Sequence, residues 1–284
     1  MKIIAGDRIQ ERCDISISKL EHKEHESRLL TDSIDIDSYD FSNYDNPNKI
    51  YVNSSLINFS KPVLAQSKLF EKLKEFKNPF DLVLHNSDQP FDEQYLKYFE
   101  IQNLNRIFTQ NVNVVHKDVI PIPIGIANDV WPYGDQEGFK KKLNNIKEKT
   151  NFIYFNFRVE GGVRGEHRPQ CYKAGLEKGL EYNKTLSFLD YIDELSTYKY
   201  CLSPEGNGID CHRMWECLYL KVIPICGRNI LTEYFSKIFP IVLIDDWDNL
   251  DLNFLEKNYD NYSNWENYNL LDLDSFLQYV KFYD

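Results

Sequence analysis

The sequence predicts an α/β protein of two domains, each built on a parallel sheet, that face each other across a cleft. Three observations lead to this prediction. Short apolar runs typical of buried strands alternate with helical patterns, which favours parallel sheets. The alternation runs through two successive series, one before residue 148 and one after it. With 284 residues, of which 42% are hydrophobic, the chain can bury two such cores.

The first series is a succession of short strands and helices. Its clearest strand is the compact apolar run at 81–84, which ends at His85-Asn86-Ser87-Asp88. Other strands are expected at 2–5, 50–52, 106–109 and 119–122, and helices at 63–76 and 94–99. A basic amphipathic helix at 138–149 lies where we expect the chain to cross to the second domain.

The second series repeats the pattern. Strands are expected at 151–157, 199–202, 222–225 and 241–244, and helices at 170–178, 186–196, 210–220, 231–235, 254–262 and 270–283. We therefore expect one Rossmann-like domain over 1–148 and another over 149–265. A C-terminal helix within 266–284 would cross back to the first domain.

Charge, cysteine content and hydropathy limit the classes of function. The net charge of −11 argues against nucleic acid and anionic membranes as partners. The six cysteines include no CxxC pair, so buried free thiols in a reducing compartment are expected. The N-terminal apolar run is too short for a signal peptide, and no later run approaches a membrane span, so the cytosol is the expected location.

The most informative segment is 198–226, which reads as strand, glycine-containing turn, helix and strand. A ligand at the carboxyl end of such a strand meets the amino end of the next helix, where phosphate is favoured. Gly206 and Gly208 would let the backbone approach a pyrophosphate, and Asp210 is a candidate N-cap. Arg213 and Glu216 are three apart and share a helix face, suited to phosphate and to a ribose diol. A surface ion pair beside an ordinary loop is the alternative.

The same segment carries a resemblance to a known family. SPEGNGID at 203–210, HRxWE at 212–216, LYL at 218–220 and IPI at 223–225 resemble the exostosin-like glycosyltransferases. They are most similar to cytosolic viral and bacterial members, including capsid-glycan enzymes of chlorella viruses. PIPIGI at 121–126 and the strand ending at Asn156 are looser matches. The resemblance implies a GT-B fold, an inverting reaction, a nucleotide-sugar donor in the C-terminal domain and an acceptor in the N-terminal one. For a viral protein the cytosol would be that of the host.

The resemblance also implies roles for residues of this chain. The turn at 206–208 and Arg213 would bind the diphosphate, and Glu216 the ribose. Many relatives carry a basic residue at the position of Glu205, and a glycine at the position of Lys221. Cations from Arg158, Arg164 or Arg168, in the glycine-rich stretch after the strand at 151–157, would compensate at Glu205. The expected donor-binding set is Arg158, Ser203, Glu205, Gly206, Asn207, Gly208, Asp210, Arg213 and Glu216.

An inverting transferase needs a general base to deprotonate the acceptor hydroxyl. Asp88 follows the strand at 81–84 and is the first candidate, with Asp7 and His85 as the others. In the alternative interpretation Asp88 only caps a turn. The D-x-D sequences at 35–37 and 246–248 resemble metal sites, but 44 acidic residues make chance matches common, and no metal is expected. Trp131 and Tyr133 could stack on a sugar face.

The predicted function is transfer of a sugar from a nucleotide diphosphate to a glycan hydroxyl, with inversion and without a metal or other cofactor. By the resemblance, UDP-xylose is the first candidate donor and a fucose-containing glycan the acceptor, with GDP-fucose second. The partners would be this donor and an oligosaccharide or glycoprotein acceptor, without nucleic acid or membrane. A non-catalytic nucleotide-sugar or glycan-binding protein and a nucleotide-sugar hydrolase are the alternatives.

Overall fold

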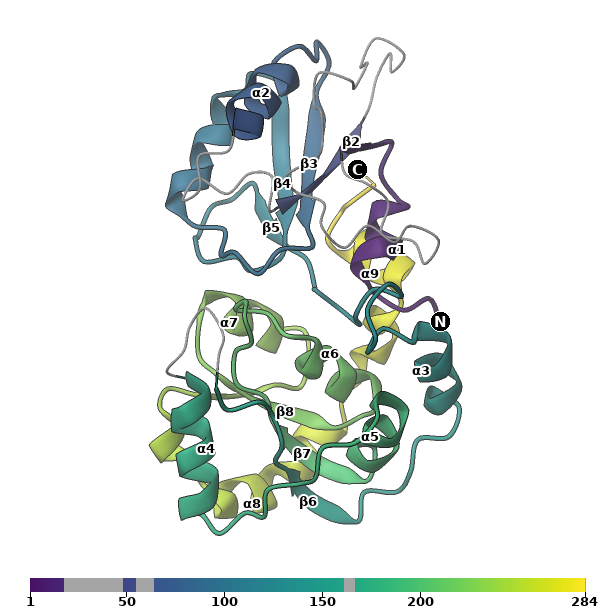
Figure 1. Ribbon diagram of the computed structural model, residues 1–284, viewed down its shortest axis with the longest axis vertical. Coiled ribbons are helices and arrows are strands. Elements are labelled where there is room, and N and C mark those ends of the chain that lie inside the picture. The colour runs from purple at the N-terminus through teal and green to yellow at the C-terminus, as the bar shows by residue number, and fades with distance from the viewer. Residues whose placement is uncertain (18–47, 55–63, 161–166, 284) are drawn as a thin grey trace.

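The chain forms a mixed α/β structure with two parallel sheets, one above the other in Figure 1. The computed structural model describes residues 1–17, 48–54, 64–160 and 167–283. The upper sheet contains β1 (Ile15–Ile17), β2 (Lys49–Asn53), β3 (Phe80–His85), β4 (Leu104–Thr109) and β5 (Val119–Pro121). The lower sheet contains β6 (Asn151–Tyr154), β7 (Tyr198–Leu202), β8 (Ile223–Gly227) and β9 (Val242–Ile244).

The order of the strands follows the order of the sequence in both sheets. Within the described residues neither sheet has the reversal of strand order found in doubly wound dinucleotide-binding folds. The prediction of parallel α/β sheets is therefore confirmed, and the more specific Rossmann-like topology is not. Every residue of β3 is buried, as expected for a central parallel strand covered on both faces.

Most predicted helices are present. They are α2 (Leu64–Leu73), η4 (Glu93–Glu100), α3 (Gln136–Leu143), α4 (His167–Glu177), α5 (Phe188–Leu195), α6 (His212–Tyr219), α7 (Ile230–Ser236) and α8 (Leu252–Ser263). The helix expected at 270–283 is divided into η6 (Asn267–Leu271) and α9 (Leu273–Tyr279). Asp272 causes this division, because its side chain accepts a hydrogen bond from the Ser275 amide and caps α9.

Three other sequence-based bounds were wrong. The segment 2–5 is not a sheet strand: Ala5 forms only isolated bridges to Gly125 and Ile126, and α1 (Gly6–Gln10) begins directly after it. The helix expected to reach residue 149 ends at Leu143. The strand expected to reach residue 157 ends at Tyr154. There the Phe155 amide turns to the side chain of Asn183, 2.9 Å away. The short strand β1 was not anticipated.

Helix α6 ends where the resemblance leads one to expect glycine. Lys221 has φ of +55°, in the left-handed region. The amide of Val222 donates to the Cys217 carbonyl at 2.8 Å and the amide of Lys221 to the Leu218 carbonyl at 3.1 Å, the two bonds of a Schellman motif. The left-handed conformation explains the preference for glycine, and this chain adopts it with lysine.

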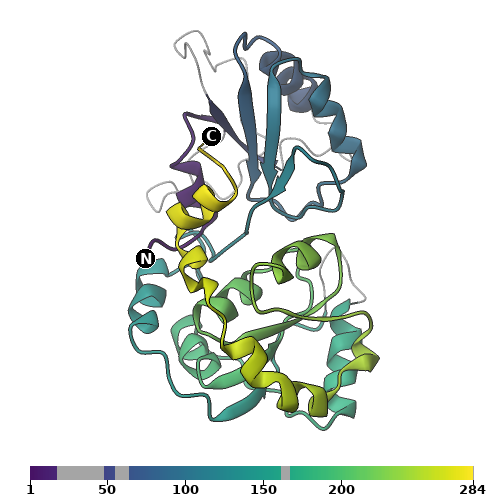
Figure 2. The same cartoon turned by 180° about the vertical axis from the view of Figure 1, so that it is seen from behind.

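The hydrophobic core and the C-terminal segment connect the two halves. One cluster joins β2 to β4 with α6, α7 and α9, and a second lies against the other side of the lower sheet. Figure 2 shows the C-terminal segment running up to the upper sheet. There Arg106 donates to the Lys281 carbonyl at 2.8 Å, and the rings of Phe108 and Phe282 lie 5.0 Å apart.

Two chain-wide predictions concern cysteines and membrane spans. All six cysteines are free; four are buried, while Cys13 and Cys211 are partly exposed. No helix among the described residues is long and apolar enough to cross a membrane.

Candidate functional site

A cavity of about 840 Å³ lies between the two sheets. Its walls are formed largely by residues that follow β3, β6 and β7, together with the first turn of α6. The carboxyl ends of parallel strands are the usual location of ligand sites in α/β folds, and the volume is within the range of small-molecule sites. Of the predicted donor-binding residues, all but Glu205 line this cavity.

Three arginines converge on the cavity: Arg158, Arg168 and Arg213. Arg168 donates from Nε to the Glu205 carbonyl at 3.0 Å and from Nη1 to the Arg158 carbonyl at 3.2 Å. Arg213 donates from Nη1 to the Asn156 carbonyl. Carbonyls orient these guanidinium groups without neutralising them. None of the three forms an ion pair within the described residues.

The arginines also act on one another. Burial lowers the pKa of the Arg168 guanidinium, and the positive charges of Arg213 and Arg158 act in the same direction, while Cys211 and Asp88 act in the opposite direction. The Arg213 guanidinium is further held over the Tyr191 ring, 4.8 Å from its centroid. Three like charges held close together without paired carboxylates form a site suited to an anion with several oxygens.

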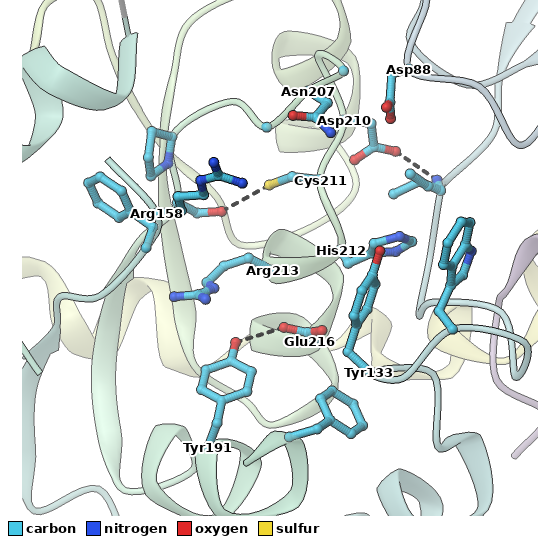
Figure 3. A pocket seen from close by; sticks show the side chains of 18 of the residues that line it. Asp88, Tyr133, Arg158, Tyr191, Asn207, Asp210, Cys211, His212, Arg213 and Glu216 are labelled. Atoms are coloured by element: carbon cyan, nitrogen blue, oxygen red, sulfur yellow. Dashed lines mark hydrogen bonds between the residues drawn. The ribbon is translucent and has the colours of Figure 1, made fainter. Parts of the chain in front are cut away.

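Glu216 lies one turn along α6 from Arg213 and is only 6% exposed. Its Oε2 accepts a hydrogen bond from the Tyr191 hydroxyl at 2.7 Å, as Figure 3 shows. Its Oε1 accepts none from the described residues. The surface ion pair considered as an alternative is absent at this position, because Glu216 is buried against Tyr191. The carboxylate can accept hydrogen bonds from a polyol that enters the cavity.

The glycine turn is built differently from the prediction. A Cβ on Gly208 would lie 2.7 Å from Oδ1 of Asn111, so this glycine is required by contact with the upper half. A Cβ on Gly206 would lie 3.3 Å from Nη2 of Arg168, on the cavity side. Asn207 between them is exposed. Close approach to a ligand is thus possible at Gly206, while the space above Gly208 is already filled.

Asp210 does not cap α6; Cys211 occupies the N-cap position. The Asp210 carboxylate instead accepts from the Ile124 amide at 2.7 Å and from Nε1 of Trp215 at 2.8 Å. It therefore joins the upper half of the cavity to α6. Burial raises the pKa of Asp210 to about 7.

Ser203 and Glu205 differ in their relation to the cavity. Ser203 lines the cavity, with its Oγ 3.3 Å from Sγ of Cys211. The Glu205 side chain points away and accepts from Asn229 at 2.8 Å. Its backbone carbonyl is the one that holds Arg168. The cation expected at this turn therefore comes from α4, while Arg164 lies outside the described residues.

The three candidate bases lie in different surroundings. Asp88 lines the cavity, is exposed, and forms no hydrogen bond or ion pair with other described residues. It caps no turn, since the Gln89 amide donates to Oγ of Ser87 instead. It also lies three residues beyond the end of β3, rather than at the strand tip.

Asp7 and His85 do not line the cavity. Asp7 is buried and accepts from Nε2 of Gln136 at 3.0 Å, and burial raises its pKa. His85 is fully buried, with Nε2 2.9 Å from the Pro123 carbonyl, and burial lowers its pKa to about 4. Both groups serve internal hydrogen bonds here.

The D-x-D at 246–248 is a local cap rather than part of the cavity. Oδ1 of Asp246 accepts from the Asp248 amide at 3.0 Å and begins the short helix η5 (Trp247–Asn249). The described residues contain no cluster of three metal-ligating side chains, and the D-x-D at 35–37 lies outside them.

Several cavity residues had no assigned role in the sequence analysis. Tyr191 was expected only as part of a helix, and His212 only as part of a motif; both line the cavity. Their contacts join segments far apart in the chain, which periodicity does not reveal. Trp131 and Tyr133, which the sequence analysis considered for stacking on a sugar, line the cavity as well, with nearly parallel rings whose centroids are 6.1 Å apart.

The site thus has the properties of a binding site for an anionic, polyhydroxylated ligand, and sequence comparison points to a class of enzyme. No known protein-family profile matches the chain. The chain is similar to a probable glycosyltransferase of Arabidopsis thaliana, with 29% identity over 114 residues. The match covers 39% of this chain and 23% of the plant protein, so the chain spans less than a quarter of that relative's length. The similarity supports a glycosyltransferase in general and does not reach the exostosin-like or viral subtype.

Proposed function

We propose that the protein is an inverting glycosyltransferase of the exostosin-like, GT-B type, which moves a sugar from a nucleotide diphosphate to a glycan hydroxyl. The observation that carries this proposal is the cluster of Arg158, Arg168 and Arg213 around one cavity, without ion-pair partners among the described residues. A diphosphate supplies the negative charge that such a cluster lacks. The plant relative supports the same class of reaction.

The donor would lie with its diphosphate against the arginines and the Gly206 turn. Its ribose would bind Oε1 of Glu216, which the Tyr191 hydrogen bond leaves open. The nucleobase would then lie against the part of the cavity lined by Leu186 and Phe188. Apolar side chains with a few placed polar groups are typical of such sites.

We propose that the reaction needs no metal, because the three arginines can balance the charge on the departing diphosphate. UDP-xylose with a fucose-containing acceptor remains the first proposed substrate pair, and GDP-fucose the second donor. The cytosolic location stays a prediction from the sequence. The two alternatives are distinguished by turnover: a binding protein releases no nucleotide from the donor, and a hydrolase releases it without need of an acceptor.

The test combines binding with turnover. Uridine, guanosine, UDP, GDP and their sugars are added to the protein and the melting temperature is measured, because a ligand of the native state raises it. Release of UDP from UDP-xylose, or of GDP from GDP-fucose, is then followed with and without a fucose-containing oligosaccharide. A transferase gives acceptor-dependent release that persists in EDTA. Release that the acceptor does not accelerate indicates a hydrolase, and binding without release indicates a binding protein.

A further inference from the structure

His212 is the first residue of α6 and lines the cavity. Its Nδ1 lies 2.7 Å from the carbonyl oxygen of Gly125. A carbonyl oxygen only accepts hydrogen bonds, so Nδ1 carries the proton. In the neutral ring, Nε2 then holds a lone pair and can take a proton. No described residue forms a hydrogen bond with Nε2.

The carbonyl that orients His212 is itself firmly placed. Gly125 has φ of +68°, and a Cβ at this position would lie 2.1 Å from the Ile4 carbonyl oxygen. The next residue, Ile126, donates its amide to the same Ile4 carbonyl at 2.8 Å. The segment that accepts from His212 is therefore fixed by backbone contacts, and the ring orientation follows from it.

His212 and Arg213 serve different parts of the cavity. Figure 3 shows their side chains leaving the start of α6 in opposite directions, with His212 beside Tyr133. The centroids of the His212 and Tyr133 rings are 6.4 Å apart. The His212 ring thus lies on the aromatic side of the cavity, away from the Arg213 guanidinium that would hold a diphosphate.

Asp88, the first candidate base from the sequence, is another group at the cavity that can accept a proton, and it differs from His212 in how it is held. Asp88 is exposed and has no described hydrogen-bond partner to fix its carboxylate. His212 is partly buried and has one nitrogen anchored and the other open. General-base catalysis depends on positioning, and an imidazole anchored through one nitrogen meets that requirement.

We propose that Nε2 of His212 is the general base of the glycosyl transfer, an inference that rests on the proposed function. Nε2 takes the proton from the acceptor hydroxyl as its oxygen forms a bond to the anomeric carbon. The bond between that carbon and the diphosphate oxygen breaks, and its electron pair leaves with the nucleoside diphosphate. The imidazolium then releases its proton to solvent, which restores the free base.

The test is His212→Asn, because the asparagine side chain can place an N–H where Nδ1 lies and keep the bond to Gly125. It removes only the nitrogen that takes the proton. Turnover of UDP-xylose or GDP-fucose with the fucose-containing acceptor should fall by about 10²- to 10⁴-fold. The Kd of UDP or GDP should change by less than about twofold. His116→Asn, which changes a histidine outside the cavity, should leave both unchanged.

The outcomes separate this inference from the proposed function. If the turnover of His212→Asn is within about threefold of that of the unsubstituted protein, His212 is not the general base. The same conclusion follows if weaker nucleotide binding accounts for the whole loss of rate. Asp88→Asn is measured in parallel, and a large loss of turnover there together with normal turnover of His212→Asn assigns the base to Asp88 and overturns this inference. If His212→Asn melts early, His212→Gln serves as the second variant, with the same expected loss. Absence of acceptor-dependent release in the unsubstituted protein rejects the proposed function itself.

Discussion

The two walls of the cavity differ in the kind of polar group they present. The lower wall, from the half that contains β6 to β9, carries Arg158, Arg168, Arg213 and Glu216. The upper wall, from the half that contains β1 to β5, carries mostly neutral groups: the amides Asn86, Gln110 and Asn128, and the rings Trp131 and Tyr133. Formal charge suits phosphates, whereas amides and aromatic rings suit sugar hydroxyls and sugar faces. The contrast indicates that the lower wall would bind the diphosphate of a donor and the upper wall the sugar of an acceptor.

The walls also differ in how their groups are held. On the upper wall, amides orient one another: Asn128 donates to Asn86 at 3.0 Å, and Asn86 donates to the Tyr51 hydroxyl at 2.7 Å. On the lower wall, backbone carbonyls orient Arg168 and Arg213. Because a carbonyl is neutral, it leaves the positive charge of the guanidinium available to a ligand. A carboxylate in an ion pair would neutralise that charge.

The largest effect is expected at Asp210, where the two walls meet. Its pKa of about 7 lies above the ordinary value of 3.8, so between these pH values the folded protein keeps a proton that the unfolded chain has lost. The contribution of Asp210 to stability is therefore full below about pH 4 and falls as pH rises to about 7, by up to about 4 kcal/mol. Asp210→Asn cannot ionise and should lose this pH dependence.

The measurement is the melting temperature of both proteins from pH 4.5 to 7.5. The advantage of the unsubstituted protein over Asp210→Asn should shrink as pH rises. Asp7, whose pKa is also raised by burial, is present in both proteins and cancels in the difference. Parallel curves for the two proteins would show that Asp210 does not titrate in this range.

The next effect concerns Glu216 on the lower wall. Glu216→Ala removes the charged acceptor for a ribose diol, so uridine and UDP, or guanosine and GDP, should both bind more weakly. Hydrogen bonds to charged groups contribute about 1.5–3 kcal/mol, which is about 10- to 150-fold in Kd. Calorimetry measures both ligands. Tyr191→Phe, which removes only the hydrogen bond that orients Glu216, is the matched control and should give a smaller loss.

Arg168 should act on the phosphates alone. Arg168→Ala should weaken the binding of UDP or GDP by about 1–2 kcal/mol, because the partly exposed guanidinium is partly screened. The nucleosides, which lack phosphate, should bind as before. Arg228→Ala, at an exposed arginine outside the cavity, should change neither. Equal losses for uridine and UDP would remove Arg168 from the phosphate site.

The sequence predicted most of the helices and strands of the lower half, but fewer of the hydrogen bonds that hold the cavity residues in place. The alternation of apolar and helical segments located β7, α6 and β8, because burial imposes a period on neighbouring residues. It assigned Asp210 to a local cap, a common role for aspartate before a helix. The residue instead bonds to Ile124, which lies 86 positions away in the chain. Such contacts depend on how the two halves pack, and no local pattern records them.

The same limit explains why the sequence selected candidate bases that do not line the cavity. Position after a strand selected Asp88, Asp7 and His85, and the structure brings only Asp88 to the cavity. His85 is the last residue of the same strand and is fully buried, with Nε2 at the Pro123 carbonyl. His212 drew attention only as part of a motif, because the carbonyl that orients it belongs to Gly125 in another segment.

The smallest effect is expected on the upper wall, at Trp131. The rings of Trp131 and Tyr133 are 39% and 49% exposed and are tilted by only 7° from parallel, so they offer an accessible flat surface. Trp131→Ala should raise the KM for the acceptor by about 2- to 10-fold, the equivalent of about 0.5–1.5 kcal/mol for an aromatic contact. The Kd of UDP or GDP should not change.

The control for Trp131 is Tyr279→Ala, which removes an exposed ring outside the cavity and should leave acceptor KM unchanged. The pattern across ligands is more informative than the size of the effect. If Trp131→Ala weakens the binding of UDP or GDP and leaves the KM for the acceptor unchanged, the aromatic surface binds the donor. Both walls would then bind the nucleotide sugar, and the acceptor would have to enter from outside the cavity. A change confined to the acceptor instead supports one wall for each substrate.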